Sequence, residues 1–243
     1  MDTIKISDRK NCKIIAHRGQ SSLEKENTIP AFVAAGNRSY FGIETDVHRT
    51  DDGKFIIVHD DTTRRVAPGI DVSVDETSYD ELRKIQVSKK YGLSNRIDLH
   101  FPNLEEYLSI CKHYEKVAVL ELKNPMPHKA MSDIIEEIKR VDYLDNLIFI
   151  SFDMDNLLYV RSQLPDQKIQ FLCGKPLTDE QIETMKANKL DADLSYKTIT
   201  CKEDVDALHN LGFEVNVWTV DDAAIAQDLI DWGVDYITTN ALE

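Results

Sequence analysis

Two strands joined by a tight turn can be read from residues 42–59, which run Gly42-Ile43-Glu44-Thr45-Asp46-Val47-His48-Arg49-Thr50-Asp51-Asp52-Gly53-Lys54-Phe55-Ile56-Ile57-Val58-His59. The dipeptide Asp52-Gly53 between the two apolar runs is a strong signal for a two-residue hairpin loop. Parallel neighbours need a crossover of a dozen or more residues, so the run 55–59 must lie antiparallel to the run before it. This hairpin decides how the other strands are counted.

Nine strand-like apolar runs alternate with helical patterns along the chain. The runs cover residues 13–17, 42–47, 55–59, 116–122, 147–152, 168–173, 191–195, 214–219 and 235–239, and clear helical patterns lie at 129–141, 179–187, 202–211 and 222–232. Once the antiparallel run is set aside, eight strand–helix units remain, which predicts a TIM (β/α)8 barrel as one domain over residues 1–243. Residues 48–100 then form a hairpin and a small insertion after the second strand. A doubly wound α/β sheet is the competing fold.

Composition narrows the classes of function. The 243 residues are 42% hydrophobic and 30% charged, with a net charge of −14. This acidity argues against nucleic acid and against anionic lipid as partners, because both are bound through Lys and Arg. The first ten residues have no apolar signal core, and no run reaches the ~18 apolar residues of a membrane span, so we expect a cytoplasmic chain without stable membrane insertion unless an export signal was trimmed from it. Four scattered cysteines, without a Cys-x-x-Cys pair, fit a reducing compartment.

The hairpin register also predicts which side chains meet. With Asp52 and Gly53 as the two loop residues, Asp46 lies opposite His59, and directly opposed residues point to the same face. Glu44 shares that face, two residues before Asp46, and His48 shares it one step beyond. A slip of one residue would reverse this placement.

Polar side chains stand at the carboxyl ends of several predicted strands, where active sites of eight-fold barrels lie. Glu44, Asp46 and Glu121 form an all-oxygen set of the kind that Mg²⁺ and Ca²⁺ prefer. Three neighbouring carboxylates without a cation would repel one another and raise their pKa values. The alternative is that the three acids pair with Arg or Lys at the rim of the barrel.

Histidines and cations complete this set. His17 and His59 can supply one proton donor and one acceptor near neutral pH, although a strand-end histidine is often purely structural. Arg18 and Lys123 are suited to holding an anion such as phosphate, and their alternative is an ion pair with the same carboxylates. The sequence contains no glycine-rich phosphate loop and no serine nucleophile elbow.

Two aromatic residues follow the same rim. Phe152 and Trp218 would contact the part of a substrate that does not react, or else pack the top of the barrel.

Several motifs together resemble the signature of the glycerophosphodiester phosphodiesterase family. They occur in the family's order and spacing across nearly the whole chain: His17-Arg18-Gly19, Glu26-Asn27-Thr28, Glu44-Thr45-Asp46, Thr50-Asp51-Asp52-Gly53, His59-Asp60, Glu121-Leu122-Lys123, Val217-Trp218-Thr219 and Gly233-Val234-Asp235-Tyr236-Ile237-Thr238-Thr239. The resemblance implies a TIM barrel with an insertion after the second strand. It also implies hydrolysis of glycerophosphodiesters to an alcohol and glycerol 3-phosphate.

The same resemblance implies roles for the site residues. His17 and His59 would be the general acid and base, Arg18 and Lys123 would bind the phosphate, and the three carboxylates would hold Mg²⁺ or Ca²⁺. Two departures from the family pattern stand out: Leu23-Glu24-Lys25 replaces a proline before Glu-Asn-Thr, and Thr239-Asn240-Ala241-Leu242 replaces Thr-Asp-x-Pro. Neither falls on the proposed catalytic set, so we expect them to change only the shape of local loops.

Rival functions remain at this point. A non-catalytic binding module could keep the barrel, and a phospholipase acting on lipid headgroups could share it. A metal-dependent aldolase is a weaker option. The headgroup alcohol, the choice between Mg²⁺ and Ca²⁺, the attacking group (water or the glycerol 2-hydroxyl) and the oligomeric state are not readable from the sequence.

Overall fold

Eight parallel strands close into a barrel in the computed structural model, which describes residues 2–87, 96 and 98–243. Strand β1 pairs with β9 on one side and with β2 on the other, so the ring has no open edge among these strands. Their bounds are β1 Lys13–Ala16, β2 Gly42–Arg49, β4 Val117–Leu122, β5 Leu147–Ser151, β6 Lys168–Cys173, β7 Asp191–Ser195, β8 Val215–Trp218 and β9 Tyr236–Thr239. The TIM barrel predicted from the strand count is confirmed.

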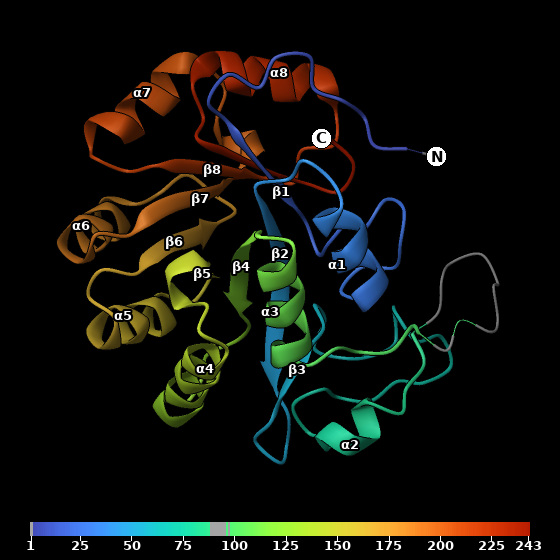
Figure 1. Cartoon of the computed structure of the whole chain (residues 1–243). Coiled ribbons are helices and arrows are strands. Elements are labelled where there is room, and N and C mark those ends of the chain that lie inside the picture. Colours follow the sequence, from blue (N-terminus) through green and yellow to red (C-terminus); the bar gives the residue numbers. More distant parts are fainter. Residues whose placement is uncertain (1, 88–95, 97) are drawn as a thin grey trace.

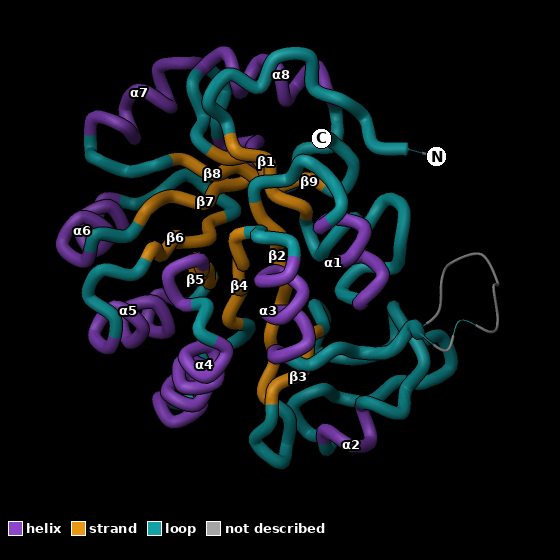
Figure 2. Tube along the Cα trace, in the orientation of Figure 1, coloured by secondary structure: helices purple, strands orange, loops and turns teal. Residues whose placement is uncertain are grey.

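Helices surround this ring in Figures 1 and 2. In the described part of the chain they are α1 Ile29–Gly36, α3 Leu104–His113, α4 His128–Val141, α5 Met154–Gln163, α6 Asp179–Asn188, α7 Lys202–Asn210 and α8 Ala223–Trp232, with short 3-10 turns at Leu144–Asn146 and Tyr196–Thr198. The short helix α2 (Tyr79–Leu82) lies away from the ring. Several begin at a side-chain cap, for example Asn103, which accepts a hydrogen bond from the backbone N–H of Glu106 at 2.8 Å. None of the helices in the described residues combines the length and the apolar character that crossing a membrane requires.

The remaining strand, β3 (Phe55–Ile57), lies antiparallel to β2 and outside the ring, as predicted. The predicted register is wrong by one residue, because Arg49 pairs with Phe55 and Thr50 faces Lys54. The loop therefore has three residues, and Gly53 closes it in the left-handed region at φ +78°. Asp46 therefore lies opposite Val58 instead of His59. His59 lies two residues beyond the end of β3.

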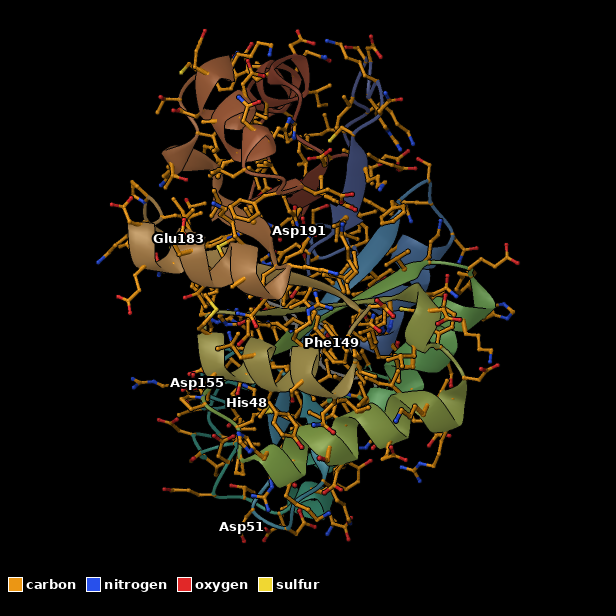
Figure 3. The ribbon with its side chains drawn as sticks, turned by 90° about the vertical axis from the view of Figure 1, so that its left-hand side faces the viewer. His48, Asp51, Phe149, Asp155, Glu183 and Asp191 are labelled. Atoms are coloured by element: carbon orange, nitrogen blue, oxygen red, sulfur yellow. The ribbon has the colours of Figure 1, made fainter. Side chains whose placement is uncertain are left out.

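The segment after β3 packs around its own small apolar cluster. This insert core is separate from the main core between the barrel and the helices, and comprises Ile56, Val58, Val66, Ala67, Val74, Leu82, Ile85, Val87, Leu99 and Phe101. Figure 2 shows the segment as loops beside the barrel, with α2 at its edge. In Figure 3, Asp51 lies at the lower tip of the hairpin, in the loop, and His48 lies further up, on β2. Of residues 48–100, predicted as the hairpin and insertion, residues 88–95 and 97 lie outside the described residues.

A polar network, here called the lower network, fills the barrel at the amino ends of the strands. Lys168 Nζ lies 2.9 Å from Asp191 and 2.7 Å from Glu214, and Tyr236 donates its O–H to Glu214 at 2.5 Å. Lys13 donates to the Tyr236 oxygen at 3.1 Å. This end of a TIM barrel serves stability, while the opposite end carries chemistry.

Candidate functional site

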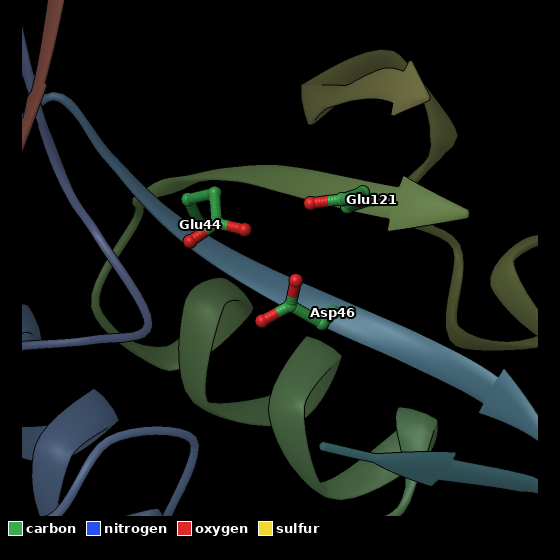
Figure 4. A group of neighbouring side chains, drawn as sticks. All are labelled: Glu44, Asp46 and Glu121. Atoms are coloured by element: carbon green, nitrogen blue, oxygen red, sulfur yellow. The ribbon is translucent and has the colours of Figure 1, made fainter. Parts of the chain in front are cut away.

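Three carboxylates converge at the carboxyl end of two neighbouring barrel strands. Glu44 and Asp46 come from β2, and Glu121 comes from β4 at the position paired with Asp46. Figure 4 shows the three groups pointing toward a common centre. One oxygen from each lies within 4.8 Å of the others, and the residues are only 3%, 0% and 7% exposed. The structure therefore brings together the acids that the sequence singled out.

Arg18 and Lys123 lie against these acids. Lys123 Nζ is 2.8 Å from Glu121 and 3.7 Å from Asp46. The backbone N–H of Arg18 donates to Glu44 at 2.8 Å, and Arg18 Nε lies 3.6 Å from Asp46. The structure thus shows the ion-pair alternative for both cations, and their role in holding a phosphate stays a prediction.

The cluster nevertheless retains a buried oxygen without a hydrogen-bond partner among the described residues. Two cations face three acids, and this oxygen is Asp46 Oδ1. Burial and the charge of Asp46 raise the pKa of Glu44 and raise that of Glu121 to about 8. Burial would also raise the pKa of Asp46, but the charges of Arg18, His59 and Lys123 hold it below its usual value. An all-oxygen donor set with an orphaned buried oxygen fits a hard divalent cation.

His17 follows β1 directly, and its ring is oriented from the end of β9. Its Nδ1 lies 2.8 Å from Asn240 Oδ1, while Asn240 Nδ2 donates to Asp221 Oδ2 at 2.7 Å. Because Asp221 accepts from the amide nitrogen, the amide oxygen must face His17, so Nδ1 carries the proton and Nε2 is the free acceptor. Burial and the neighbouring Arg18 lower the pKa of His17 to about 4, which keeps the ring neutral at pH 7.

This contact corrects one expectation. The departure from the family pattern at Asn240 was expected to affect only loop shape. It places an amide where the family pattern has a carboxylate, in direct contact with the ring of His17.

His59 is held differently, by a carboxylate. Its Nδ1 lies 2.6 Å from Asp60 Oδ1, and Arg65 binds both oxygens of Asp60 at 2.6 and 2.9 Å. Arg65 also binds both oxygens of Glu26, at 2.7 and 2.8 Å. Burial lowers the pKa of His59, although the charge of Asp46 opposes this shift.

His48 supports the backbone at this point. Its Nε2 lies 3.3 Å from the carbonyl oxygen of His59, and its Nδ1 lies 3.1 Å from Asp75 Oδ1. The ring is buried and joins the barrel strand to the insert.

A cavity of about 130 Å³ connects these groups. Its polar side is formed by His17, Arg18, Glu44, His59 and Glu121, and its other walls include Phe152, Trp218, Ile150, Leu172, Asp193, Thr219 and Thr238. Lys123 lines an adjoining depression with Glu121 and Phe152. The rings of Phe152 and Trp218 pack edge to face with 5.5 Å between their centroids, and Phe152 is 51% exposed. The structure thus brings the predicted site residues to one end of the barrel.

Sequence reasoning missed several residues around the site. Asn27 stood in a quoted motif without a role; its Nδ2 donates to Asp46 at 2.8 Å, and its Oδ1 accepts from the Thr45 hydroxyl at 2.8 Å. Its backbone is left-handed, at φ +54°, which Asn tolerates better than most residues. Arg65 and Asp193 carried no local signal, because only the folded chain brings them to the site.

Comparisons with known proteins find relatives over nearly the whole chain. The model of the glycerophosphoryl diester phosphodiesterase family matches residues 17–243. The glycerophosphodiester phosphodiesterase of Caldanaerobacter subterraneus subsp. tengcongensis is 28% identical over 229 residues, covering 93% of both chains, and that of Bacillus subtilis is 28% identical over 93% of this chain and 82% of its own.

Solved structures give the same picture of the fold. A glycerophosphodiester phosphodiesterase from Parabacteroides distasonis superimposes with a TM-score of 0.80 at 29% identity, covering 96% of this chain and 94% of its own. An Oleispira antarctica phosphodiesterase, solved in complex with the product sn-glycerol-3-phosphate, has a TM-score of 0.86 at 24% identity, covering 94% and 92%.

Proposed function

Because the chain belongs to the glycerophosphoryl diester phosphodiesterase family and is therefore a hydrolase of glycerophosphodiesters, we propose that it works through a bound divalent cation and the two histidines His17 and His59. The products would be an alcohol and glycerol 3-phosphate. The observation that supports this proposal is that both imidazoles line one cavity together with Arg18, Glu44 and Glu121.

Glu44, Asp46 and Glu121 would hold the cation, either Mg²⁺ or Ca²⁺. When bound, such an ion stabilises negative charge on phosphate oxygens and orients the ester. Arg18 would bind the phosphate from the wall of the cavity, and Lys123 would bind it from the adjoining depression. Phe152 and Trp218 would contact the non-reacting part of the substrate.

The two histidines would move protons in opposite directions. His17 is neutral, with Nδ1–H donated to an amide oxygen, so its Nε2 is free to accept a proton from the attacking group, either water or the glycerol 2-hydroxyl. His59 donates Nδ1–H to the Asp60 carboxylate, which partly offsets the lowering of its pKa by burial and favours the protonated ring that would protonate the leaving alkoxide. Arg65 would act as a positioning residue, because it fixes Asp60 behind His59 and Glu26 behind Arg18.

A chelation and mutagenesis experiment tests this proposal. Hydrolysis of glycerophosphocholine should stop with EDTA and return with Mg²⁺ or Ca²⁺. His17→Ala and His59→Ala should each lower kcat by ~10²–10⁴-fold, with metal binding by calorimetry unchanged. His113→Ala, on the exposed end of α3, is the matched control and should keep wild-type turnover. If either cavity variant kept most of its turnover while binding metal, the role assigned to that histidine would be wrong.

A further inference from the structure

Asp193 is a buried carboxyl group that the proposed mechanism does not use. It lies in the middle of β7, is 1% exposed, and lines the same cavity as the two histidines. Its Oδ1 has no hydrogen-bond partner among the described residues. Leaving a buried polar group unpaired is unfavourable, so an oxygen of this kind in a cavity wall is suited to a ligand group.

Hydrogen bonds fix several of the groups around Asp193. Its backbone carbonyl accepts a hydrogen bond from Trp218 Nε1 at 3.1 Å, which fixes the strand against the aromatic wall. Nearby inside the barrel, Asn216 donates to Gln170 at 3.1 Å and accepts from Thr238 at 3.3 Å. Gln170 Nε2 is also buried without a partner among the described residues, and Asp193 remains part of the cavity lining.

The hydrogen-bonding capacity of this carboxyl suits an alcohol. A carboxylate oxygen accepts a hydrogen bond from a hydroxyl group, and a carboxylic acid can also donate one.

We propose that Asp193 is a specificity-determining residue that hydrogen-bonds a hydroxyl group of the glycerol arm of the substrate. This inference rests on the proposed function, which places the phosphate at the polar side of the cavity. A space of about 130 Å³ suits a small polyol arm, while the exposed ring of Phe152 lies where a variable headgroup would reach solvent. A site built to bind a hydroxyl discriminates strongly against ligands that lack it, because its own buried group is then left unpaired.

The test compares two phosphate monoesters by titration calorimetry on the Mg²⁺-loaded protein. sn-Glycerol 3-phosphate carries two hydroxyls, and ethyl phosphate carries none. We expect wild type to bind the glycerol ester roughly tenfold or more tightly than the ethyl ester. In Asp193→Leu this ratio should fall roughly tenfold, with ethyl phosphate affinity nearly unchanged. Asp193→Asn, which keeps a donor and an acceptor, should preserve the ratio within about threefold.

The outcomes separate this inference from the proposed function. An unchanged ratio in Asp193→Leu, or equal loss of affinity for both esters, would overturn the role of Asp193. Should the leucine variant fail to fold, equal binding of the two esters by wild type would overturn it without any variant. Binding is measured without turnover, so an enzyme that bound both esters as expected but hydrolysed no glycerophosphodiester would refute only the proposed function.

Discussion

Exchanging the amide partner of His17 for a carboxylate should move the pH dependence of the enzyme. In Asn240→Asp, the new carboxylate stands at the position of Asn240 Oδ1, 2.8 Å from His17 Nδ1. An opposite charge at this distance favours the protonated ring and raises a pKa by about 1–3 units. The pKa of His17, now about 4, would therefore rise to between roughly 5 and 7.

The consequence for activity follows from the sign of this shift. If His17 is the general base, only its neutral form is active, so a higher pKa removes activity at acidic pH and leaves it intact at alkaline pH. For a rise to about 6, the neutral fraction at pH 5.5 falls from nearly all to about one quarter, which lowers kcat/KM about fourfold. Above pH 8 the variant should match wild type.

The neighbouring carboxylate of Asp221 has to be considered in the design of the Asn240→Asp variant. Asn240 Nδ2 donates to Asp221 Oδ2 at 2.7 Å, so the single variant places two carboxylates side by side. The double variant Asn240→Asp with Asp221→Asn restores a donor between them and should show the larger shift of the two.

The assay combines kcat/KM from pH 4.5 to 8.5 at saturating Mg²⁺ with NMR titration of the histidine rings, in which His113 is an internal reference. An acidic limb that moves with the ring titration supports His17 as the base. A ring titration that moves while the acidic limb does not would refute that role. A ring titration that does not move would show that the contact with Asn240 does not control the charge of His17.

Two further changes test other parts of the structure. Lys168→Met breaks the lower network and leaves the carboxylates of Asp191 and Glu214 without their cation, so the free energy of unfolding in urea should fall by about 1–3 kcal/mol. The value of kcat should not change, and the exposed control Lys197→Met should change the free energy of unfolding by no more than about 0.5 kcal/mol. A loss of activity without a loss of stability would contradict the structural role of this network. His48→Ala removes the ring that contacts the backbone carbonyl of His59 and should lower kcat roughly tenfold with little effect on KM. His48→Gln should recover part of the rate. An unchanged kcat in the alanine variant would show that His59 keeps its position without the His48 ring.

The barrel was predictable because its evidence is local. Each strand is a short apolar run, and the Asp52-Gly53 turn identified the one strand that could not be part of the ring. Glu44, Asp46 and Glu121 were predictable as a group for a related reason, since adjacent parallel strands place their carboxyl ends at the same height.

The sequence-based predictions fail in two situations. In one, a single residue changes the length of a turn, and in the other, segments far apart in the sequence come into contact. The hairpin loop has three residues because Thr50 bonds Lys54 and Gly53 adopts a left-handed backbone, which an Asp-Gly pair allows equally well. The contact between Asn240 and His17 spans 223 residues of sequence, and no spacing rule reports it. Arg65 likewise reaches Glu26 only after the insert folds back over the barrel.

One half of the proposed proton-transfer pair is supplied from outside the ring of strands. His59 directly follows Val58 of the insert core, whereas His17 directly follows Ala16 of the main core. Under the proposed mechanism both packed units would have to be intact for turnover, and regions with separate cores can open at different free energies. A substitution that weakens only the insert core would yield a protein with a nearly unchanged melting temperature and little activity. A library of variants selected for thermal stability alone would therefore retain inactive members.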